Sequence, residues 1–234
     1  MSDGLADEVL FRPVRSGNAF EDTVARLLQT IRLGVVAPGE ALPPERDLAT
    51  RFSVSRDTVR EAIRSLSDAG YLVARRGRYG GTFVSDRLPA ADAVAPSRDE
   101  LDDALGLRFI LETGAARAAA ARQLSAADRE QLWSRLRETA TAAPEDYRRL
   151  DSRLHLTIGE LVAVPSLVSL LADTRTRVNA LLDVIPLLPR NIAHSNEQHE
   201  AIVLAILTGD PDRAAEAMSE HLAGSEALLR GFLA

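Results

Sequence analysis

The sequence predicts a mainly α-helical fold of two domains, a small helical domain that ends in a β hairpin and a larger all-α antiparallel helical bundle. Apolar residues recur at helical spacing along most of the 234 residues, and strand-like alternation is confined to 71–84. A Pro/Ala-rich segment at 87–98 separates the two patterns and is typical of a linker. We therefore expect domains at 18–86 and 99–234, with a flexible arm at 1–17.

A pair of helices joined by a tight turn is predicted in the first domain, after a supporting helix over about 19–33. The first helix of the pair begins at Pro43 and Pro44, because the N–H groups of a first turn lack intrahelical partners and proline is tolerated there. The second helix begins after Ser55, a good N-cap, and ends at Gly70.

Two short strands follow, at 71–74 and 82–84, and the segment between them is rich in glycine and arginine. Such a hairpin can approach a phosphate backbone closely. The order of helix, turn, helix and hairpin is the layout of a winged helix-turn-helix, which is a DNA-binding arrangement.

Arginines give the second helix of the pair a basic face, on which Arg56, Arg60 and Arg64 stand one turn apart. Residues 51–87 contain eight arginines and four acids, whereas 88–234 contain fifteen arginines and twenty-two acids. The total charge of −6 is therefore compatible with a basic segment near the amino end. An ordinary solvated helix face is the alternative interpretation. The adjacent turn and basic hairpin favour binding to double-stranded DNA.

Composition excludes several other classes. The chain has no cysteine, so disulfide frameworks and thiolate metal sites are excluded. No stretch is long and apolar enough to span a bilayer, and the first ten residues lack the pattern of a signal peptide. We expect a cytoplasmic protein with no membrane partner.

The second domain is helical throughout in its pattern, and no strand-like alternation interrupts it. Ser125 before an acidic first turn and Asp210 before Pro211 are signals for helix starts. Six helices are predicted, at about 99–122, 126–140, 144–162, 166–184, 191–207 and 211–232.

Three of the four histidines fall on apolar helix stripes. His199 follows Ser195 by one turn, His221 lies on a similar stripe, and Asp151 stands one turn before His155. A buried aspartate requires a positive partner. A divalent cation bound by one carboxylate oxygen and three imidazole nitrogens is one candidate, and an arginine, either Arg175 or Arg108, is the other.

Two further interpretations of this cluster stay open. Three nitrogens and a carboxylate could activate water in a metal-dependent hydrolase, although no further carboxylate or histidine is obviously placed as a general base. The cluster could instead be satisfied internally in a metal-free sensor of acyl-type ligands.

The stretch 42–84 resembles the DNA-binding domain of GntR-type transcriptional regulators. The resemblance lies in LPPERDLA at 42–49, VSRDTVREAI at 54–63 and GTFV at 81–84. Ser53 departs from the family pattern, in which glycine is common at this turn.

The remainder resembles the FCD ligand-binding domain of the FadR subfamily. The resemblance lies in an R-x-x-x-E pattern at Arg108, a D-x-x-x-H pattern at Asp151, an S-x-x-x-H pattern at Ser195, and the late His221. Val164 stands where asparagine is frequent in the family, so the next helix loses a cap.

The resemblance implies a homodimeric, effector-responsive transcription regulator and not an enzyme. We expect it to be a repressor that reads a short palindromic operator. The implied DNA-binding residues are Arg46, Ser55, Arg56, Thr58, Arg60, Arg75, Gly80 and Gly81, with the wing glycines in the minor groove.

The resemblance also implies a divalent metal ion, zinc or nickel, beside a pocket for a small organic acid. The implied metal ligands are Asp151, His155, His199 and His221. Arg108, Arg175 and Asn179 are the expected further contacts of the effector.

Overall fold

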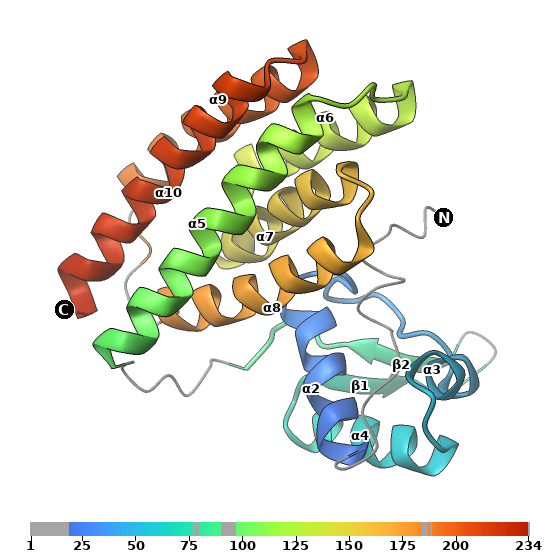
Figure 1. Cartoon of the computed structure of the whole chain (residues 1–234). Helices are drawn as coiled ribbons and strands as arrows, with labels where there is room; N and C mark the ends of the chain where they lie inside the picture. Colours follow the sequence, from blue (N-terminus) through green and yellow to red (C-terminus); the bar gives the residue numbers. More distant parts are fainter. Residues whose placement is uncertain are drawn as a thin grey trace. The chain divides into compact units, whose positions relative to one another are not determined.

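The computed structural model describes residues 19–75, 77, 80–89, 97–183, 187 and 189–233 (Figure 1). The chain divides into two compact units, residues 1–90 and 91–234, which we call the N-terminal unit and the helical unit. The predicted class is confirmed, because nearly all described elements are helices. The predicted arm at 1–17 and most of the predicted linker lie outside the described residues.

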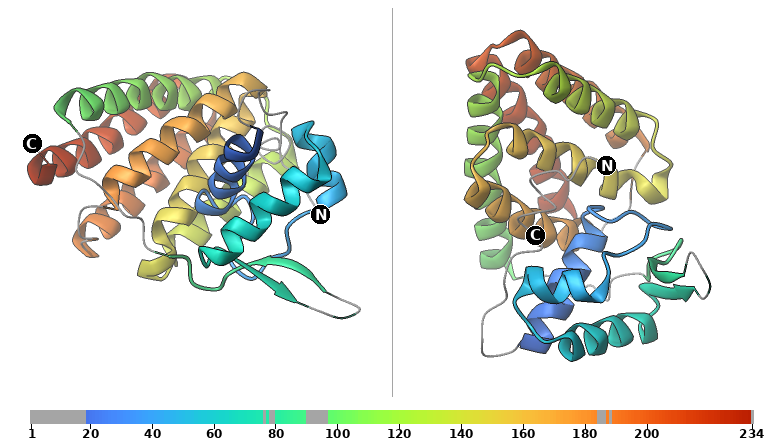
Figure 2. Two further views of the ribbon diagram at one scale, coloured as in Figure 1. Left: turned by 90° about the horizontal axis from the view of Figure 1, so that it is seen from below. Right: turned by 90° about the vertical axis from the view of Figure 1, so that its right-hand side faces the viewer.

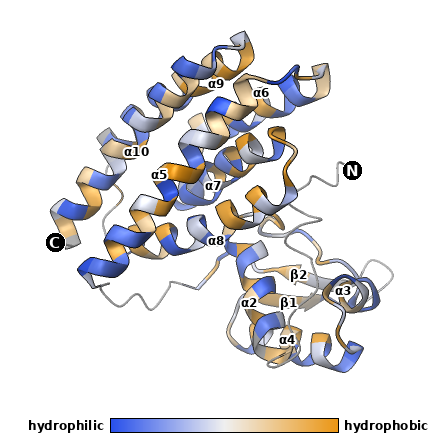
Figure 3. Cartoon of the chain, viewed as in Figure 1, coloured by the Kyte–Doolittle hydropathy of each residue, from blue (hydrophilic) through white to orange (hydrophobic). Residues whose placement is uncertain are grey.

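The N-terminal unit contains α2 (Ala19–Arg32), α3 (Glu45–Phe52) and α4 (Arg56–Asp68). Their apolar faces share one core, in which Leu27 and Phe52 are fully buried. Figure 3 shows hydrophilic and hydrophobic residues alternating along these helices, as expected when one face of each is buried.

The predicted start of α3 is two residues early. Pro44 is the N-cap, with φ −53° and ψ 142°, and the helix begins at Glu45. At the other end Ser53 adopts the left-handed conformation, with φ 55° and ψ 42°, and its N–H bonds back to the last turn. A non-glycine residue with positive φ is uncommon, so the serine is held there by its helix-terminal hydrogen bonds.

The wing is an antiparallel hairpin of β1 (Leu72–Arg75) and β2 (Gly81–Val84), in which Arg75 is paired with Gly81. A Cβ atom at Gly80 would lie 2.5 Å from the carbonyl oxygen of Arg75. The backbone therefore requires glycine at Gly80, apart from any role of that residue on DNA.

The helical unit contains six helices in its described part, and the antiparallel bundle is confirmed. Helix α5 packs against α7, α8, α9 and α10, and it lies along α10 in all the views (Figures 1 and 2). The six bounds agree with the predicted ones to within two residues at each described end: α5 (Arg98–Ala120), α6 (Ala126–Ala140), α7 (Pro144–Leu161), α8 (Pro165–Leu182), α9 (Pro189–Thr208) and α10 (Pro211–Leu233).

Local signals explain where these helices begin. Ser125 accepts a hydrogen bond from the N–H of Asp128, whose carboxylate accepts from the N–H of Ser125, so α6 has a reciprocal capping box. Val164 provides no side-chain cap for α8. None of the described helices combines the length and the apolar character needed to cross a bilayer.

Candidate metal centre and its cavity

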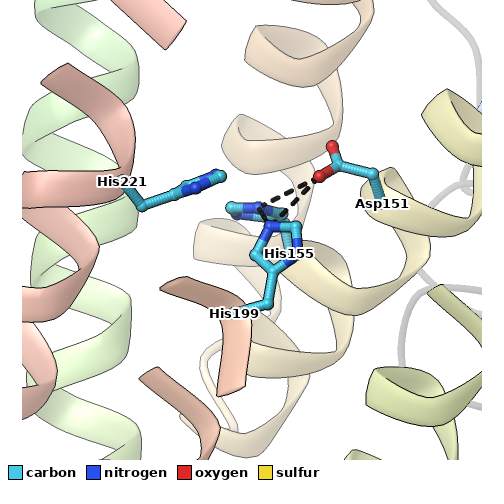
Figure 4. Close-up of side chains that lie close together, drawn as sticks. All are labelled: Asp151, His155, His199 and His221. Carbon is cyan, nitrogen blue, oxygen red and sulfur yellow. Dashed lines mark hydrogen bonds and ion pairs between the residues drawn. The ribbon is translucent and has the colours of Figure 1, made fainter. Parts of the chain in front are cut away.

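Four side chains from three helices meet inside the helical unit. Asp151 and His155 come from α7, His199 from α9 and His221 from α10 (Figure 4). One potential ligand atom from each lies within 4.8 Å of all the others. The three histidines are buried, and the side chain of Asp151 is 13% exposed. The cluster predicted from the spacing is therefore assembled and could hold a metal ion.

The donor atoms face a common point. Oδ1 of Asp151 lies 3.2 Å from Nε2 of His199 and 3.7 Å from Nε2 of His155. In Figure 4 the ring of His221 extends from α10 toward the other imidazoles. Its Nε2 is buried and has no hydrogen-bond partner among the described residues. An unpartnered buried nitrogen is costly, and a bound cation would satisfy it.

The opposite ring nitrogens fix the tautomers. Nδ1 of His155 lies 2.6 Å from Oε2 of Glu112, and Nδ1 of His221 lies 3.3 Å from Oε1 of Gln198. Both oxygens can only accept a hydrogen bond, so each Nδ1 carries the proton and each Nε2 keeps its lone pair toward the cluster. Oriented imidazoles of this kind are typical of metal ligands.

The local electrostatics also suit a cation. Burial lowers the pKa of His221 well below its usual value, and the neighbouring His199 adds to this shift. Burial also lowers the pKa of His155, with Glu112 opposing the shift. Burial would raise the pKa of Asp151, but Arg175 and His155 outweigh it and hold that pKa well below its usual range. Neutral imidazoles and an ionised carboxylate are a suitable donor set for zinc or nickel.

Two carboxylates and two arginines surround the cluster. Asp151 binds Nη2 of Arg175 through Oδ2, while its Oδ1 faces the histidines. Oε1 of Glu112 lies 3.4 Å from Nε of Arg108 and 3.5 Å from Nη1 of Arg175. Asp151 therefore has the arginine partner that one interpretation of the sequence required, and it still presents an oxygen to a metal ion.

A cavity of about 160 Å³ adjoins the cluster, and Asp151 and His221 form part of its wall. Arg108, predicted as an effector contact, lines it and donates to Oγ of Ser225 at 2.7 Å. The other two predicted contacts take different positions and are not among the described residues of the wall. Arg175 is fully buried against Asp151, and Asn179 donates to Oγ of Ser152 at 2.8 Å.

Three functional candidates were missed from the sequence. Glu112 appeared only as the last residue of the R-x-x-x-E pattern that begins at Arg108, although it also holds His155. Gln198 supports His221 from a different helix, and no local pattern could have shown this. Arg148 lines the cavity, and its position one turn before Asp151 on α7 is a signal that could have found it.

The predicted DNA-binding residues of the N-terminal unit lie on α3, α4 and the wing. Arg46, Arg56 and Arg60 are exposed. Ser55 caps α4 by accepting from the N–H of Thr58, and their hydroxyl oxygens are 2.8 Å apart. These two hydroxyl groups therefore already have a structural role at the start of the helix.

Acidic neighbours hold Arg46 and Arg60, and those of Arg60 come from two helices. Nη1 of Arg60 lies 3.0 Å from Oδ1 of Asp57, and Nη2 lies 3.2 Å from Oε2 of Glu45, so α3 and α4 are tied together. In the wing, the guanidinium of Arg75 lies 4.4 Å from the ring centroid of Phe83, and Gly80 is exposed.

Comparison with known proteins finds two matching families. The family described as bacterial regulatory proteins, gntR family, matches residues 20–84, and the FCD domain matches residues 103–224. A protein of Escherichia coli (strain K12) whose name assigns it to the regulation of the L-lactate dehydrogenase operon is 30% identical over 94% of this chain and 88% of its own length. The Uxu operon transcriptional regulator of the same strain is 30% identical over 79% of this chain and 76% of its own length. The solved structure of E. coli McbR/YncC shares the fold, with a TM-score of 0.58, 19% identity and coverage of 92% of this chain and 98% of that one.

Proposed function

The chain belongs to the GntR family of bacterial regulatory proteins and is a DNA-binding transcription regulator with an FCD domain, and from this premise we propose that it is a metabolite-responsive repressor of the FadR subfamily. It acts as a homodimer, and its operator is a short palindrome. Its effector is a small carboxylate bound at a divalent metal ion in the helical unit. One observation supports this most directly: Asp151 and His221 belong both to the metal cluster and to the cavity wall.

The metal ion is zinc or nickel, held by the four clustered side chains of α7, α9 and α10. The unpartnered Nε2 of His221 is the observation that fits a bound ion best. When bound, the ion supplies positive charge and open coordination positions next to the cavity. Glu112 and Gln198 keep His155 and His221 in the ligating tautomer.

The effector carboxylate lies between the metal centre and Arg108. The guanidinium of Arg108 is the proposed direct contact, because it lines the cavity and can donate to a carboxylate with two parallel N–H groups. Arg175 and Asn179 act indirectly, through Asp151 and Ser152. The name of the E. coli relative refers to L-lactate dehydrogenase, and lactate is a small carboxylate, which supports this class of effector.

On the DNA, each protomer of the dimer reads one half-site with α4 in the major groove. The proposed contacts come from Arg46, Arg56, Thr58 and Arg60, with Arg75, Gly80 and Gly81 in the wing and Ser55 at the start of α4. Arginine contacts to phosphates supply affinity, and bidentate contacts to a guanine edge supply specificity. The effector changes operator affinity by favouring one arrangement of the protomers, with a coupling free energy of about 1 to 3 kcal/mol.

Two variants test the proposal together with metal analysis and a gel-shift titration. The purified protein should contain about one divalent ion per chain, and His199→Ala should lose it. His194→Ala is the matched control for metal content on the same helix, since the His194 side chain lines the cavity but is 66% exposed and lies outside the cluster. Arg56→Ala should weaken operator binding without changing metal content. Absence of a bound ion, or unchanged operator binding by Arg56→Ala, would contradict the corresponding half of the proposal.

A further inference from the structure

The cavity contains a second cationic side chain that does not belong to the metal cluster. Arg148 lines the cavity from α7, one turn before Asp151. Its Nε lies 3.3 Å from Oδ1 of Asp183, the residue that caps the C-terminus of α8. The side chain of Arg148 is 21% exposed and that of Asp183 is 40% exposed. A carboxylate of the protein therefore already occupies one edge of this guanidinium.

The buried charges around the cluster balance before any ion is added. Arg108 and Arg175 are matched by Glu112 and Asp151, which contact them directly. Imidazoles bind a metal ion in their neutral form, so a bound divalent ion adds two positive charges. One carboxylate of an effector offsets half of this excess, and a second carboxylate offsets the rest.

The remaining wall of the cavity suits a carbon chain between two acidic ends. Apolar side chains of α8, α9 and α10 line it, together with one that precedes α9: Leu182, Leu187, Ile192 and Leu228. Methylene groups bury favourably against such side chains. The wall also contains polar side chains, among them Asn191, Ser195 and Gln198.

We propose that Arg148 forms a second anion subsite and that the effector is a short aliphatic dicarboxylate. This inference rests on the proposed function, because it places the first carboxylate beside the metal centre and Arg108. The second carboxylate binds Arg148 and replaces Asp183 there. A guanidinium has five N–H donors in a planar fork and binds a carboxylate bidentately, so the exchange replaces the contact of Nε with Asp183 by two parallel hydrogen bonds. Asp183 is easily displaced, because a partly exposed ion pair contributes little.

Isothermal titration of the metal-loaded full-length protein with succinate and with butyrate tests the subsite. The two acids have the same number of carbons and differ in one terminal carboxylate. We expect succinate to bind about tenfold more tightly, the effect of one charge-assisted contact. Arg148→Met should remove this preference, because it should weaken the binding of succinate and leave the binding of butyrate unchanged. Asp183→Asn should increase the affinity for succinate several-fold, because it removes the carboxylate that competes for Arg148.

Arg149→Met is the matched control. Arg149 is the next residue of α7, pairs with Asp146 at 2.9 Å and is not among the described residues of the cavity wall. It should leave both affinities unchanged. Melting curves and metal content of each variant report on folding and on the cluster.

Equal affinity for the two acids, no binding of either, or an Arg148→Met effect of equal size on both would overturn the subsite. The same experiment separates this failure from failure of the proposed function. If the wild-type protein holds no ion yet prefers succinate in an Arg148-dependent way, the metal proposal is wrong and the subsite stands. If the ion is present without any preference, only the subsite is wrong.

Discussion

Oε2 of Glu112 lies 2.6 Å from Nδ1 of His155, and each of the two side chains is 1% exposed. Burial would raise the pKa of Glu112, but His155, Arg108 and Arg175 outweigh it and lower that pKa far below its usual value. The carboxylate is therefore ionised under all ordinary conditions. It connects a metal-ligand candidate on α7 with arginines on α5 and α8, so its loss should affect both metal affinity and stability.

Glu112→Gln should weaken metal binding about 10- to 100-fold, as expected when the partner of a metal-ligating histidine is changed. Competition with a chromophoric chelator measures this affinity. The variant should also lose stability on the order of 3 kcal/mol, because Arg108 keeps its charge without its buried carboxylate partner and Arg175 keeps only Asp151. Glu226→Gln, at a partly exposed ion pair on α10, is the control. Unchanged affinity in Glu112→Gln would show that Glu112 does not orient His155.

The metal-free protein should lose stability as the pH falls below about 6.5. In the unfolded chain a histidine titrates near that value, whereas the folded-state pKa values of His155 and His221 are lowered. Below pH 6.5 the unfolded chain binds protons that the folded chain does not, so unfolding becomes more favourable by up to about 1.4 kcal/mol per group and pH unit. The pKa of Asp151 is also lowered in the folded chain, so this residue reduces the stability further only below about pH 4.

Melting temperatures of chelator-treated protein between pH 8 and pH 5 measure this dependence. His221→Phe should flatten the curve, because it removes an imidazole whose pKa is lowered in the folded chain. A wild-type curve without slope in this range would contradict the neutral, buried state of these imidazoles.

Asp57→Asn should tighten DNA binding. Asp57 and Glu45 hold Arg60 in ion pairs on the exposed face of α4. Exposed pairs of this kind are worth about 0.2 to 1 kcal/mol, so release of Arg60 from one of them corresponds to a gain of up to about fivefold. Fluorescence anisotropy with operator and with random duplex measures it. Asp212→Asn, at an exposed pair in the helical unit, should change neither affinity. Weaker binding by Asp57→Asn would indicate that the carboxylate itself contacts the DNA.

Gly159→Ala should destabilise the helical unit by about 1 to 3 kcal/mol, the usual cost of inserting a methyl group into a packed core. A Cβ atom at Gly159 would lie 2.3 Å from Cδ1 of Leu171, which is 1% exposed, so the leucine side chain must repack or α7 and α8 must move apart. Gly114→Ala on α5 is the matched control, because a Cβ there meets nothing within 4 Å. It should stabilise by about 0.5 to 1 kcal/mol, since alanine favours a helix interior. Thermal unfolding of both variants provides the comparison, and equal shifts in the two would refute this account of the packing.

Helix positions could be predicted because their signals are local. Ser55 and Ser125 both cap the helices predicted to follow them. The start of α3 was misplaced because proline is accepted both in the first turn and at the N-cap, so two successive prolines do not fix the first helical residue. Serine is not a residue type that favours positive φ, so only the glycine that is common at this turn in the family pointed to the left-handed conformation of Ser53.

The metal cluster could be predicted only in part. Spacing placed Asp151 and His155 on one face of one helix, but which helices face them depends on long-range packing. That packing brings Glu112 and Gln198 behind the imidazoles. It also directs Arg175 to Asp151 and away from the cavity, a choice that periodicity within one helix cannot decide.

His221 comes from α10, which follows all the other described helices along the chain. Ribosomal synthesis proceeds from the amino end, so every residue of the N-terminal unit exists before this imidazole has been made. A nascent polypeptide can therefore contain a finished DNA-reading unit while its metal cluster is still incomplete. A stop codon before α10 would therefore leave the N-terminal unit complete and the cluster without His221.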